Sequence, residues 1–357
     1  MIRVGLVGFG MAGRVFHGPL LSSVEGLELA AVMERSTDKG AERYPGITVY
    51  RSLEAMLADA SLGLFVVATP NATHYDLAKQ ILSAGKNVVV DKPMTITSAE
   101  AAELMGLAKK HNAFLAPFHN RRCDSDFLTV QKLLHEGSLG RVVAFESRFD
   151  RWRPARLTER VWKEDLDSGG MLQDLGPHLV DQALALFGLP EAVSAEVLRE
   201  RDGDGPNDSF TIRLRYPRLM VTLGSNLLSL TAKPRYRARG TSGGYVKLGV
   251  DLQEAALTKI TRIENRAGEG SAWGQEPTSA WGLLYVDIDG GKVSRPVPAV
   301  VGDYRLYYAG VRDALLGKAP FPVTGLDGWR VARLLEWAVE SSEKRCEVVC
   351  DWSEEPE

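Results

Sequence analysis

The sequence predicts an α/β fold in which a doubly wound parallel sheet is followed by an α+β domain with an open, mainly antiparallel sheet. Over the first 120 residues, short and almost continuous apolar runs alternate with helical patterns, which is typical of strands buried on both faces of a parallel sheet. Beyond that point, alternating strands are separated by hairpin signals, which is typical of an antiparallel sheet. A length of 357 residues suits two domains, which we place at 1–119 and 120–357.

Five apolar runs predict the strands of the first sheet, at residues 3–7, 27–33, 63–69, 87–90 and 113–118. The segments between them predict helices at 52–59, 73–84 and 98–111. Thr97 and Glu100 precede and open the last helix with the spacing of a capping box. Regular alternation of strand and helix predicts the doubly wound arrangement.

The second half predicts one open sheet with helices on one of its faces. Hairpin signals at 241–244 and 289–291 separate strands within 192–300, and a further strand is predicted at 141–148. The predicted helices of this half lie at 126–136, 170–187, 304–316 and 327–344.

The other face of this sheet is predicted to carry apolar side chains, namely Leu219, Val221, Leu223, Tyr245, Leu248 and Val250. A large exposed apolar face is unusual on a monomer. The pattern therefore predicts a homodimer or homotetramer that packs through the C-terminal sheet.

Composition argues against several classes of function. The net charge of −3 gives no bulk attraction to nucleic acid or to anionic lipid. The three cysteines contain no CxxC pair, which favours a reducing compartment, and scattered cysteines without HExxH predict no metal site. Because there is no signal-peptide pattern and no apolar run near the ~20 residues of a membrane helix, we expect a cytoplasmic protein.

A glycine motif follows the first predicted strand and leads into a helix: Gly8, Phe9, Gly10, Met11, Ala12 and Gly13. In dinucleotide-binding Rossmann domains, such glycines let the backbone approach a pyrophosphate at a helix N-terminus. Glu34 lies 21 residues after Gly13, where a carboxylate can accept both hydroxyls of the adenosine ribose. The alternative is a glycine-rich turn without a ligand.

The same region predicts which nicotinamide cofactor is preferred. The carboxylate of Glu34 repels a 2′-phosphate and favours NAD, whereas Arg35 and Lys39 favour NADP. We expect NAD to bind better with modest discrimination, and NADP is the alternative.

Two more segments follow predicted strands at the edge where doubly wound sheets bind ligands. Thr69, Pro70, Asn71 and His74 follow the third strand, and Asp91 and Lys92 follow the fourth. We predict that all six contact the cofactor. The alternatives are a helix cap for the first segment and a solvated loop lysine for the second.

Together these motifs resemble the Gfo/Idh/MocA oxidoreductases, which include glucose–fructose oxidoreductase and inositol dehydrogenases. The similarity continues through the segments 119–122, 124–127, 149–151, 174–178 and 302–304 and is strongest to the scyllo-inositol dehydrogenase-like branch. The third motif of the family is usually Glu-Lys-Pro, so Asp91 is a variant.

The chemistry is expected to centre on Asp174 and His178, which are four residues apart and share a helix face. Spacing alone favours an exposed Asp–His pair without a catalytic role. The resemblance implies that both face the substrate. His178 would then be the base, Asp174 would hold the substrate hydroxyl or orient His178, and Lys92 would polarise the reacting oxygen.

The remaining site candidates have competing interpretations. His119, Asn120 and Arg121 would line the sugar site or anchor the domain junction. Trp152 would cover the apolar face of a polyol or pack in a core or an interface.

The sequence thus predicts an NAD(P)-dependent dehydrogenase acting on CH–OH groups of a cyclic, inositol-like polyol or sugar. Two alternatives stay open: a non-catalytic dinucleotide-binding redox sensor, and an NAD-dependent relative that cleaves glycosides.

Overall fold

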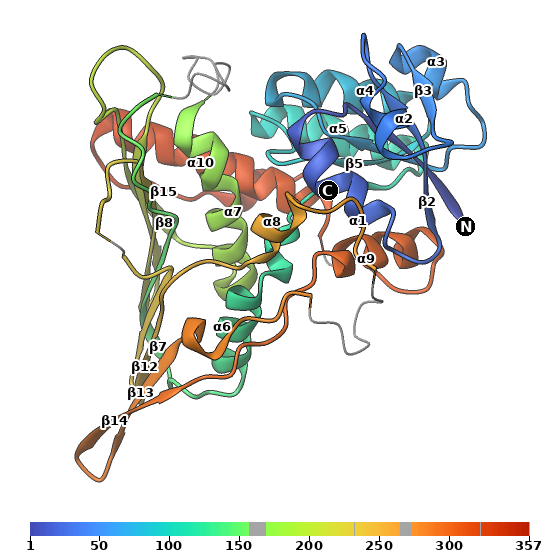
Figure 1. Cartoon of the computed structure of the whole chain (residues 1–357). Helices are drawn as coiled ribbons and strands as arrows, with labels where there is room; N and C mark the ends of the chain where they lie inside the picture. The colour runs from blue at the N-terminus through green and yellow to red at the C-terminus, as the bar shows by residue number, and fades with distance from the viewer. Residues whose placement is uncertain (157–168, 232, 265–272, 322, 357) are drawn as a thin grey trace.

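The computed structural model describes residues 1–156, 169–231, 233–264, 273–321 and 323–356. Two sheets form separate parts of the molecule, and Figure 1 shows the first in blue to cyan and the second seen along its edge. In the described helices, no segment is long and apolar enough to cross a membrane.

The first sheet has six parallel strands in the order β3-β2-β1-β4-β5-β6. The order reverses between β1 and β4, which is the point where doubly wound sheets bind ligands. The strands are β1 Ile2–Val7, β2 Leu27–Met33, β3 Thr48–Tyr50, β4 Leu64–Val67, β5 Asn87–Val90 and β6 Leu115–Pro117.

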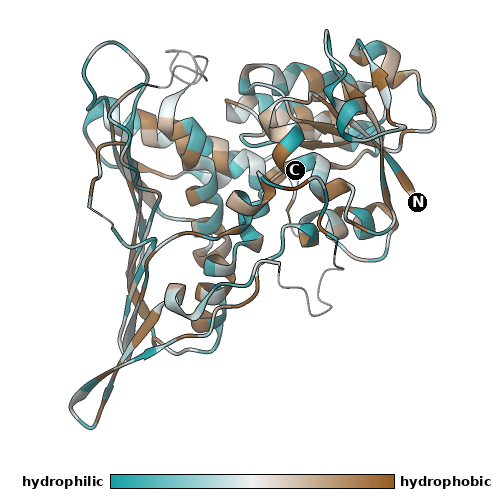
Figure 2. Cartoon of the chain, viewed as in Figure 1, coloured by the Kyte–Doolittle hydropathy of each residue, from teal (hydrophilic) through white to brown (hydrophobic). Residues whose placement is uncertain are grey.

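Burial on both faces explains the apolar runs. In β4, Phe65 and Val67 pack into one hydrophobic cluster and Leu64 and Val66 into another, and all four are fully buried. Figure 2 shows the hydrophobic residues concentrated in this interior. The predicted parallel sheet is confirmed, although β3 and the short helix α2 (Lys39–Arg43) were missed because neither carries an apolar run.

Helices α3 (Leu53–Leu57), α4 (His74–Ser83) and α5 (Ser98–His111) lie where helices were predicted. The capping box of α5 is confirmed by the bonds between Thr97 and Glu100. The glycine motif leads into a π-helical turn (Gly13–His17) that continues as α1 (Gly18–Leu21).

The second sheet has nine strands in the order β14-β13-β12-β11-β7-β10-β9-β8-β15. Among the described residues, β7 and β10 pair in parallel and the other neighbours are antiparallel, so the predicted mainly antiparallel sheet is confirmed. The strands are β7 Val142–Arg148, β8 Ala192–Leu198, β9 Ser209–Tyr216, β10 Leu219–Asn226, β11 Tyr236–Gly240, β12 Gly243–Lys247, β13 Leu283–Ile288, β14 Gly291–Pro296 and β15 Val348–Val349.

Both predicted hairpins are present. Asp289 and Gly290 join β13 to β14 with φ values of 53° and 81°, as a tight hairpin turn with two left-handed residues requires. The turn between β11 and β12 lies at residues 241–242.

Helices cover one face of the second sheet, between that sheet and the rest of the molecule (Figure 1). They are α6 (Ser125–His135), α7 (Gly170–Phe187) and α10 (Gly325–Lys344). The shorter α8 (Gln253–Leu257) lies near the junction, and α9 (Arg305–Leu315) packs Tyr308 and Val311 into a core cluster of the first sheet.

The apolar residues predicted for the face of this sheet without helices do not lie there, so that assignment was wrong. Val221, Leu223 and Tyr245 are at most 1% exposed and pack into the core, and Leu219 packs against that core. Leu248 and Val250 are exposed but follow the end of β12. Because side chains alternate along a strand, assigning the wrong parity moves every residue to the other face. The paired residues crossing the open face of β9, β10, β7 and β11 are Arg213, Thr222, Glu146 and Arg237.

Candidate active site

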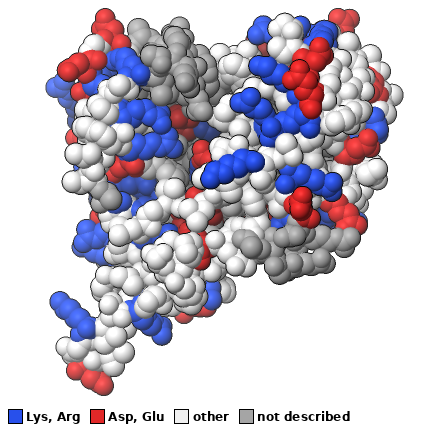
Figure 3. All heavy atoms as spheres, in the orientation of Figure 1, with Lys and Arg blue, Asp and Glu red and all other residues white. Residues whose placement is uncertain are grey.

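A cavity of about 560 Å³ lies between the carboxyl end of the first sheet and α7 of the second part. Its volume is within the range of small-molecule sites, roughly 300–1,000 Å³. Figure 3 shows a hollow between the two parts of the molecule, with Lys and Arg side chains on both sides of it. The cavity walls come from both sheets, so a ligand of the first part would meet groups supplied by the second.

The glycine loop is shaped to admit a ligand. A Cβ at Gly13 would lie 2.4 Å from the Gly8 carbonyl oxygen, and Gly8 itself has a φ of 97°, so both positions require glycine. Gly10 has no atom within 4 Å of its Cβ position and lines the cavity with Met11 and Ala12. This loop fits the pyrophosphate of a dinucleotide, because Gly8 and Gly13 pack closely against each other while Gly10 faces open space in the cavity. Phe9 turns away and packs against Tyr44.

Glu34 directly follows β2, and its side chain is buried, with only 6% of the residue exposed. Its carboxylate accepts hydrogen bonds from the Thr37 hydroxyl and from the Gly40 N–H, the latter at 2.6 Å. Arg35 is exposed beside it, and neither residue lines the cavity. Contact of Glu34 or Arg35 with the adenosine ribose stays a prediction.

Thr69, Pro70 and Asn71 line the cavity, whereas His74 lies behind its wall. Their contact with a cofactor stays a prediction. The ring of His74 is buried between the carbonyl oxygens of Pro93, 2.7 Å from Nδ1, and Thr69, 2.8 Å from Nε2. The position of His74 does not support the predicted direct contact with a cofactor. Its ring instead links the loop after β4, which contains Thr69, to the loop after β5, which contains Pro93.

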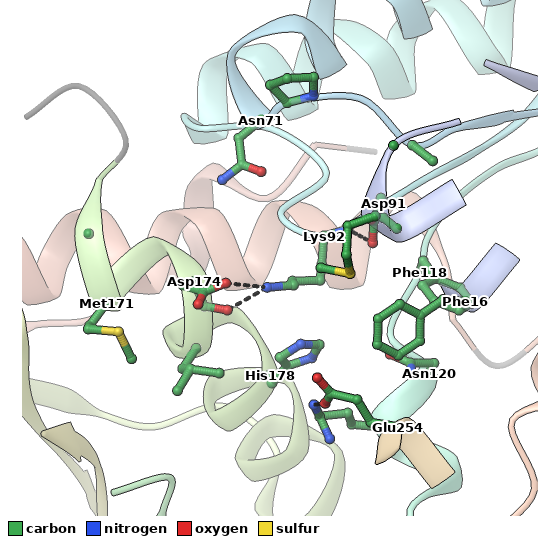
Figure 4. Close-up of a pocket in the computed structure, with 18 of the residues that line it drawn as sticks. Phe16, Asn71, Asp91, Lys92, Phe118, Asn120, Met171, Asp174, His178 and Glu254 are labelled. Carbon is green, nitrogen blue, oxygen red and sulfur yellow. Dashed lines mark hydrogen bonds and ion pairs between the residues drawn. The ribbon is translucent and has the colours of Figure 1, made fainter. Parts of the chain in front are cut away.

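Lys92 and Asp174 meet across the cavity (Figure 4). The Lys92 Nζ donates to the Asp174 carbonyl oxygen at 2.5 Å and to its Oδ1 at 3.2 Å. The position of Asp174 depends on two glycines that begin α7: a Cβ at Gly170 would lie 2.3 Å from the Asn207 carbonyl oxygen. The sequence folds this way because Gly169 and Gly170 both adopt positive φ and let the helix start against Asn207.

His178 lies one turn after Asp174 on α7 and lines the same cavity (Figure 4). It is 5% exposed, and in the described part of the chain its Nδ1 has no hydrogen-bond partner. Burial and the nearby charges of Lys92 and Arg121 hold the pKa of His178 well below its usual value. The imidazole is therefore neutral near pH 7 and free to accept a proton.

Asp91 supports Lys92 from behind. One oxygen accepts the Lys92 backbone N–H at 2.8 Å, and the other lies 3.7 Å from the His17 Nε2. Although burial raises the pKa of Asp91, the contact with His17 holds it below its usual range. The His17 Nδ1 in turn lies 2.6 Å from the Tyr308 hydroxyl, so this chain of contacts links the Lys92 loop to α9, which packs against the first sheet.

The predicted substrate residues divide into two groups. Asn120 and Arg121 line the cavity, and Arg121 forms ion pairs with Glu254 and Asp124. His119 is 2% exposed, lies behind the wall at 3.7 Å from the Asp181 Oδ1, and has a pKa lowered by burial. Trp152 is 52% exposed and outside the cavity lining. Direct substrate contact by His119 and Trp152 is therefore not supported by their positions.

Comparison with known proteins identifies the family. Residues 2–119 match the model of an oxidoreductase family with an NAD-binding Rossmann fold, and residues 127–246 match the Gfo/Idh/MocA C-terminal domain. The chain is 41% identical to YdgJ of Escherichia coli (strain K12), an uncharacterized oxidoreductase, over 96% of this chain and 97% of that protein. The chain belongs to the Gfo/Idh/MocA oxidoreductases.

Two further relatives agree with this assignment to the Gfo/Idh/MocA family. The chain is 35% identical to the scyllo-inositol 2-dehydrogenase (NADP(+)) IolW of Bacillus subtilis (strain 168), over 96% of this chain and 94% of the relative. A solved oxidoreductase structure from Yersinia pestis superimposes with a TM-score of 0.91 at 41% identity, covering 98% of this chain and 97% of that one.

Several cavity residues of this Gfo/Idh/MocA protein were missed by sequence reasoning. Arg151 and Arg153 line the cavity on either side of the outward-facing Trp152. The signal was available: the segment is extended, with the Arg151 and Arg153 N–H groups bonded to the carbonyls of Asn226 and Leu227, so alternate residues share a face. The other missed lining residues are Arg14, Phe16, Ala68, Phe118, Gly170, Met171, Leu175, Arg201, Pro206, Asn207, Leu227 and Glu254.

Proposed function

We propose that this protein is an NAD(P)-dependent dehydrogenase that interconverts a secondary hydroxyl and a ketone on a cyclic polyol or sugar. The observation that carries the proposal is the convergence of Lys92, Asp174 and His178 on a cavity that also contains the glycine loop. A cation, a carboxylate and a neutral imidazole are the groups that alcohol oxidation requires beside a hydride acceptor.

The cofactor would lie along the edge of the first sheet. Gly10, Met11 and Ala12 would hold its pyrophosphate, and the loop from Thr69 to Asn71 would lie along its other side. A bound nicotinamide supplies the hydride acceptor or donor. The carboxylate of Glu34 disfavours a 2′-phosphate, so we propose NAD as the preferred form, with NADP as the alternative that exposed Arg35 would support.

The side chains of α7 and Lys92 would divide the chemistry. His178 accepts the hydroxyl proton, because its low pKa leaves the ring neutral at working pH. Lys92 stabilises the negative charge that develops on the reacting oxygen. Asp174 holds the Lys92 ammonium in place and accepts a hydrogen bond from the substrate.

The substrate class is supported by the names of relatives. IolW is named a scyllo-inositol 2-dehydrogenase (NADP(+)), and a protein of Escherichia coli (strain K12) that is 28% identical over 200 residues is named D-glucoside 3-dehydrogenase. Both names describe oxidation of a ring hydroxyl. This agreement supports a polyol or sugar, with hydride transfer at a ring carbon.

The experiment is a spectrophotometric screen of purified protein with NAD and NADP against inositols, aldoses and glycosides. We expect cofactor reduction with at least one ring polyol. A protein that binds NADH in a fluorescence titration yet reduces neither cofactor with any member of the panel would be a sensor and not a dehydrogenase.

We also propose that two or more copies pack through the open face of the second sheet. Its paired residues include both signs of charge, with Arg213 and Arg237 on either side of Thr222 and Glu146. Across a twofold axis such a face meets itself, so an arginine of one copy can oppose a glutamate of the next.

A further inference from the structure

Among the residues that the structure describes, the cavity walls carry more positive than negative charge. Six lining residues are cationic: Lys92, Arg14, Arg121, Arg151, Arg153 and Arg201. Three are acidic: Asp91, Asp174 and Glu254. Among the described lining residues, the cations therefore outnumber the carboxylates two to one, which exceeds what a neutral substrate and one dinucleotide would need.

Contacts account for three of the six cations. Lys92 pairs with Asp174, Arg121 pairs with Glu254, and Arg201 is held by buried Asp208 at 3.1 Å. Arg14, Arg151 and Arg153 remain. In the part of the chain that the structure describes, the side chains of these three form no hydrogen bond and no ion pair.

The three unpaired arginines occupy different ends of the cavity. Arg14 directly follows the glycine loop, so the phosphates of the dinucleotide can neutralise it. Arg151 and Arg153 come from the other part of the molecule, in the extended segment after β7. Backbone bonds to Asn226 and Leu227 fix this segment, and the alternation of side chains directs both guanidinium groups to the same side.

This arginine pair is close to the proposed reaction centre. Burial lowers the pKa of Arg151, and the charges of Asp174 and Glu254, which line the same cavity, oppose this effect. Within the described ranges, no carboxylate contacts the half-buried Arg151 guanidinium. The group therefore bears a desolvation cost without an ion-pair partner, as expected of a group that receives an anion.

We propose that the substrate carries an anionic group, a phosphate monoester or a carboxylate, which Arg151 and Arg153 bind while the ring hydroxyl meets Lys92 and His178. This rests on the dehydrogenase function proposed above. A guanidinium group binds phosphate and carboxylate oxygens through two parallel hydrogen bonds. A phosphate carries a charge of about −1.5 to −2 at pH 7, which matches two arginines, and a carboxylate matches them in part.

The test compares matched substrates on the full-length protein with NAD or NADP. The panel pairs a neutral polyol with its monophosphate and a neutral sugar with its phosphate and its uronate. We expect kcat/KM to be at least about tenfold higher for one anionic class, which identifies the group, and added salt should raise KM for that class alone.

Variants locate the effect. Arg151→Gln and Arg153→Gln should each lower kcat/KM for the anionic substrate by roughly 10- to 100-fold, the loss of one charge-assisted contact. For the matched neutral substrate, the decrease in kcat/KM should be at least tenfold smaller. The Kd for NADH should stay unchanged. Arg151→Lys keeps the charge and loses the two parallel donors, so its kcat/KM for the anionic substrate should lie between those of the wild type and Arg151→Gln. An intermediate value also shows that the loss in Arg151→Gln is not caused by misfolding. Arg218→Gln, in the exposed turn between β9 and β10, is the matched control.

The outcomes separate this inference from the proposed function. If neutral polyols are oxidised as well as their anionic partners, and the arginine variants affect both equally, the dehydrogenase stands and the anion site is wrong. If no substrate is oxidised but calorimetry shows inorganic phosphate binding that Arg151→Gln removes, the anion site stands and the dehydrogenase is wrong. Phosphate binding that survives both variants overturns the anion site as well.

Discussion

Replacing Lys92 with methionine should change both the rate and its pH dependence. The Lys92 ammonium donates to Asp174 at 2.5 and 3.2 Å, and its charge is one of the causes that lower the pKa of His178. Methionine keeps most of the length of the side chain and removes the charge and the donors. Loss of one preorganised donor at an oxyanion site costs roughly 10²–10³ in kcat, or about 2.7–4 kcal/mol, so we expect a fall of that order.

The direction of the pH effect follows from the sign of the shift. Oxidation requires neutral His178, so kcat/KM is full above the pKa of His178, which lies below 6.5, and falls as the pH decreases through it. Without Lys92 the imidazolium is less disfavoured, and the pKa of His178 rises toward its usual value. Burial is the larger cause of the depression and persists, so the rise should be partial.

The assay is a kcat/KM profile between pH 5 and 9, with NADH titrations on the same preparations. Lys79→Met is the matched control, because Lys79 also pairs with a carboxylate, Glu103, but does so on the surface of the first part. An acid limb that stays in place or moves to lower pH in Lys92→Met would refute the electrostatic coupling. Loss of NADH binding would instead make Lys92 a cofactor-positioning residue.

Three other predictions concern the base, the cofactor and assembly. His178→Gln should lower kcat by roughly 10²–10⁴ and remove the acid limb, with NADH affinity unchanged; near-normal turnover in steady-state kinetics would rule out this base. Arg35→Gln should weaken NADPH more than NADH, and a wild-type preference for NADPH above about tenfold, or ~1.4 kcal/mol, would show that Arg35 outweighs Glu34. Light scattering at micromolar concentration should give a particle larger than 39.1 kDa, and a single species of that mass would contradict packing through the open sheet face.

The cofactor side of the cavity could be predicted because its residues follow parallel strands. The carboxyl ends of such strands meet at one edge of a sheet, so Thr69, Asn71 and Lys92 were placed together by their positions in the sequence alone. What this reasoning could not give is which of them faces inward. His74 belongs to the same motif as Thr69, yet its ring is buried between two backbone carbonyls behind the wall.

His17 shows a second limit of sequence reasoning. It lies one turn after Gly13 and had no assigned role, because its partners are Asp91, 74 positions later, and Tyr308 on α9. Nothing local to the first helix signals such partners. Only the packing of α9 against the first sheet brings Tyr308 within 2.6 Å of the imidazole.

On the substrate side, the residues that face the cavity depend on which of two alternating sets points inward. Two wrong predictions assign residues to the opposite face of an extended segment. Trp152 was expected at the substrate because an aromatic ring suits a sugar face. An extended segment directs neighbouring side chains to opposite sides, however, and Arg151 and Arg153 line the cavity instead. The same one-residue ambiguity assigned Val221 and Leu223 to the open face of β10, although both are buried beneath the helices. An error of one residue along an extended segment assigns every side chain to the wrong face. It therefore changes both the ligand inferred for a site and the character inferred for a surface. The same alternation that directs Trp152 out of the cavity directs Arg151 and Arg153 into it. The site expected to bind an uncharged polyol therefore has two cationic side chains that no described acid pairs with.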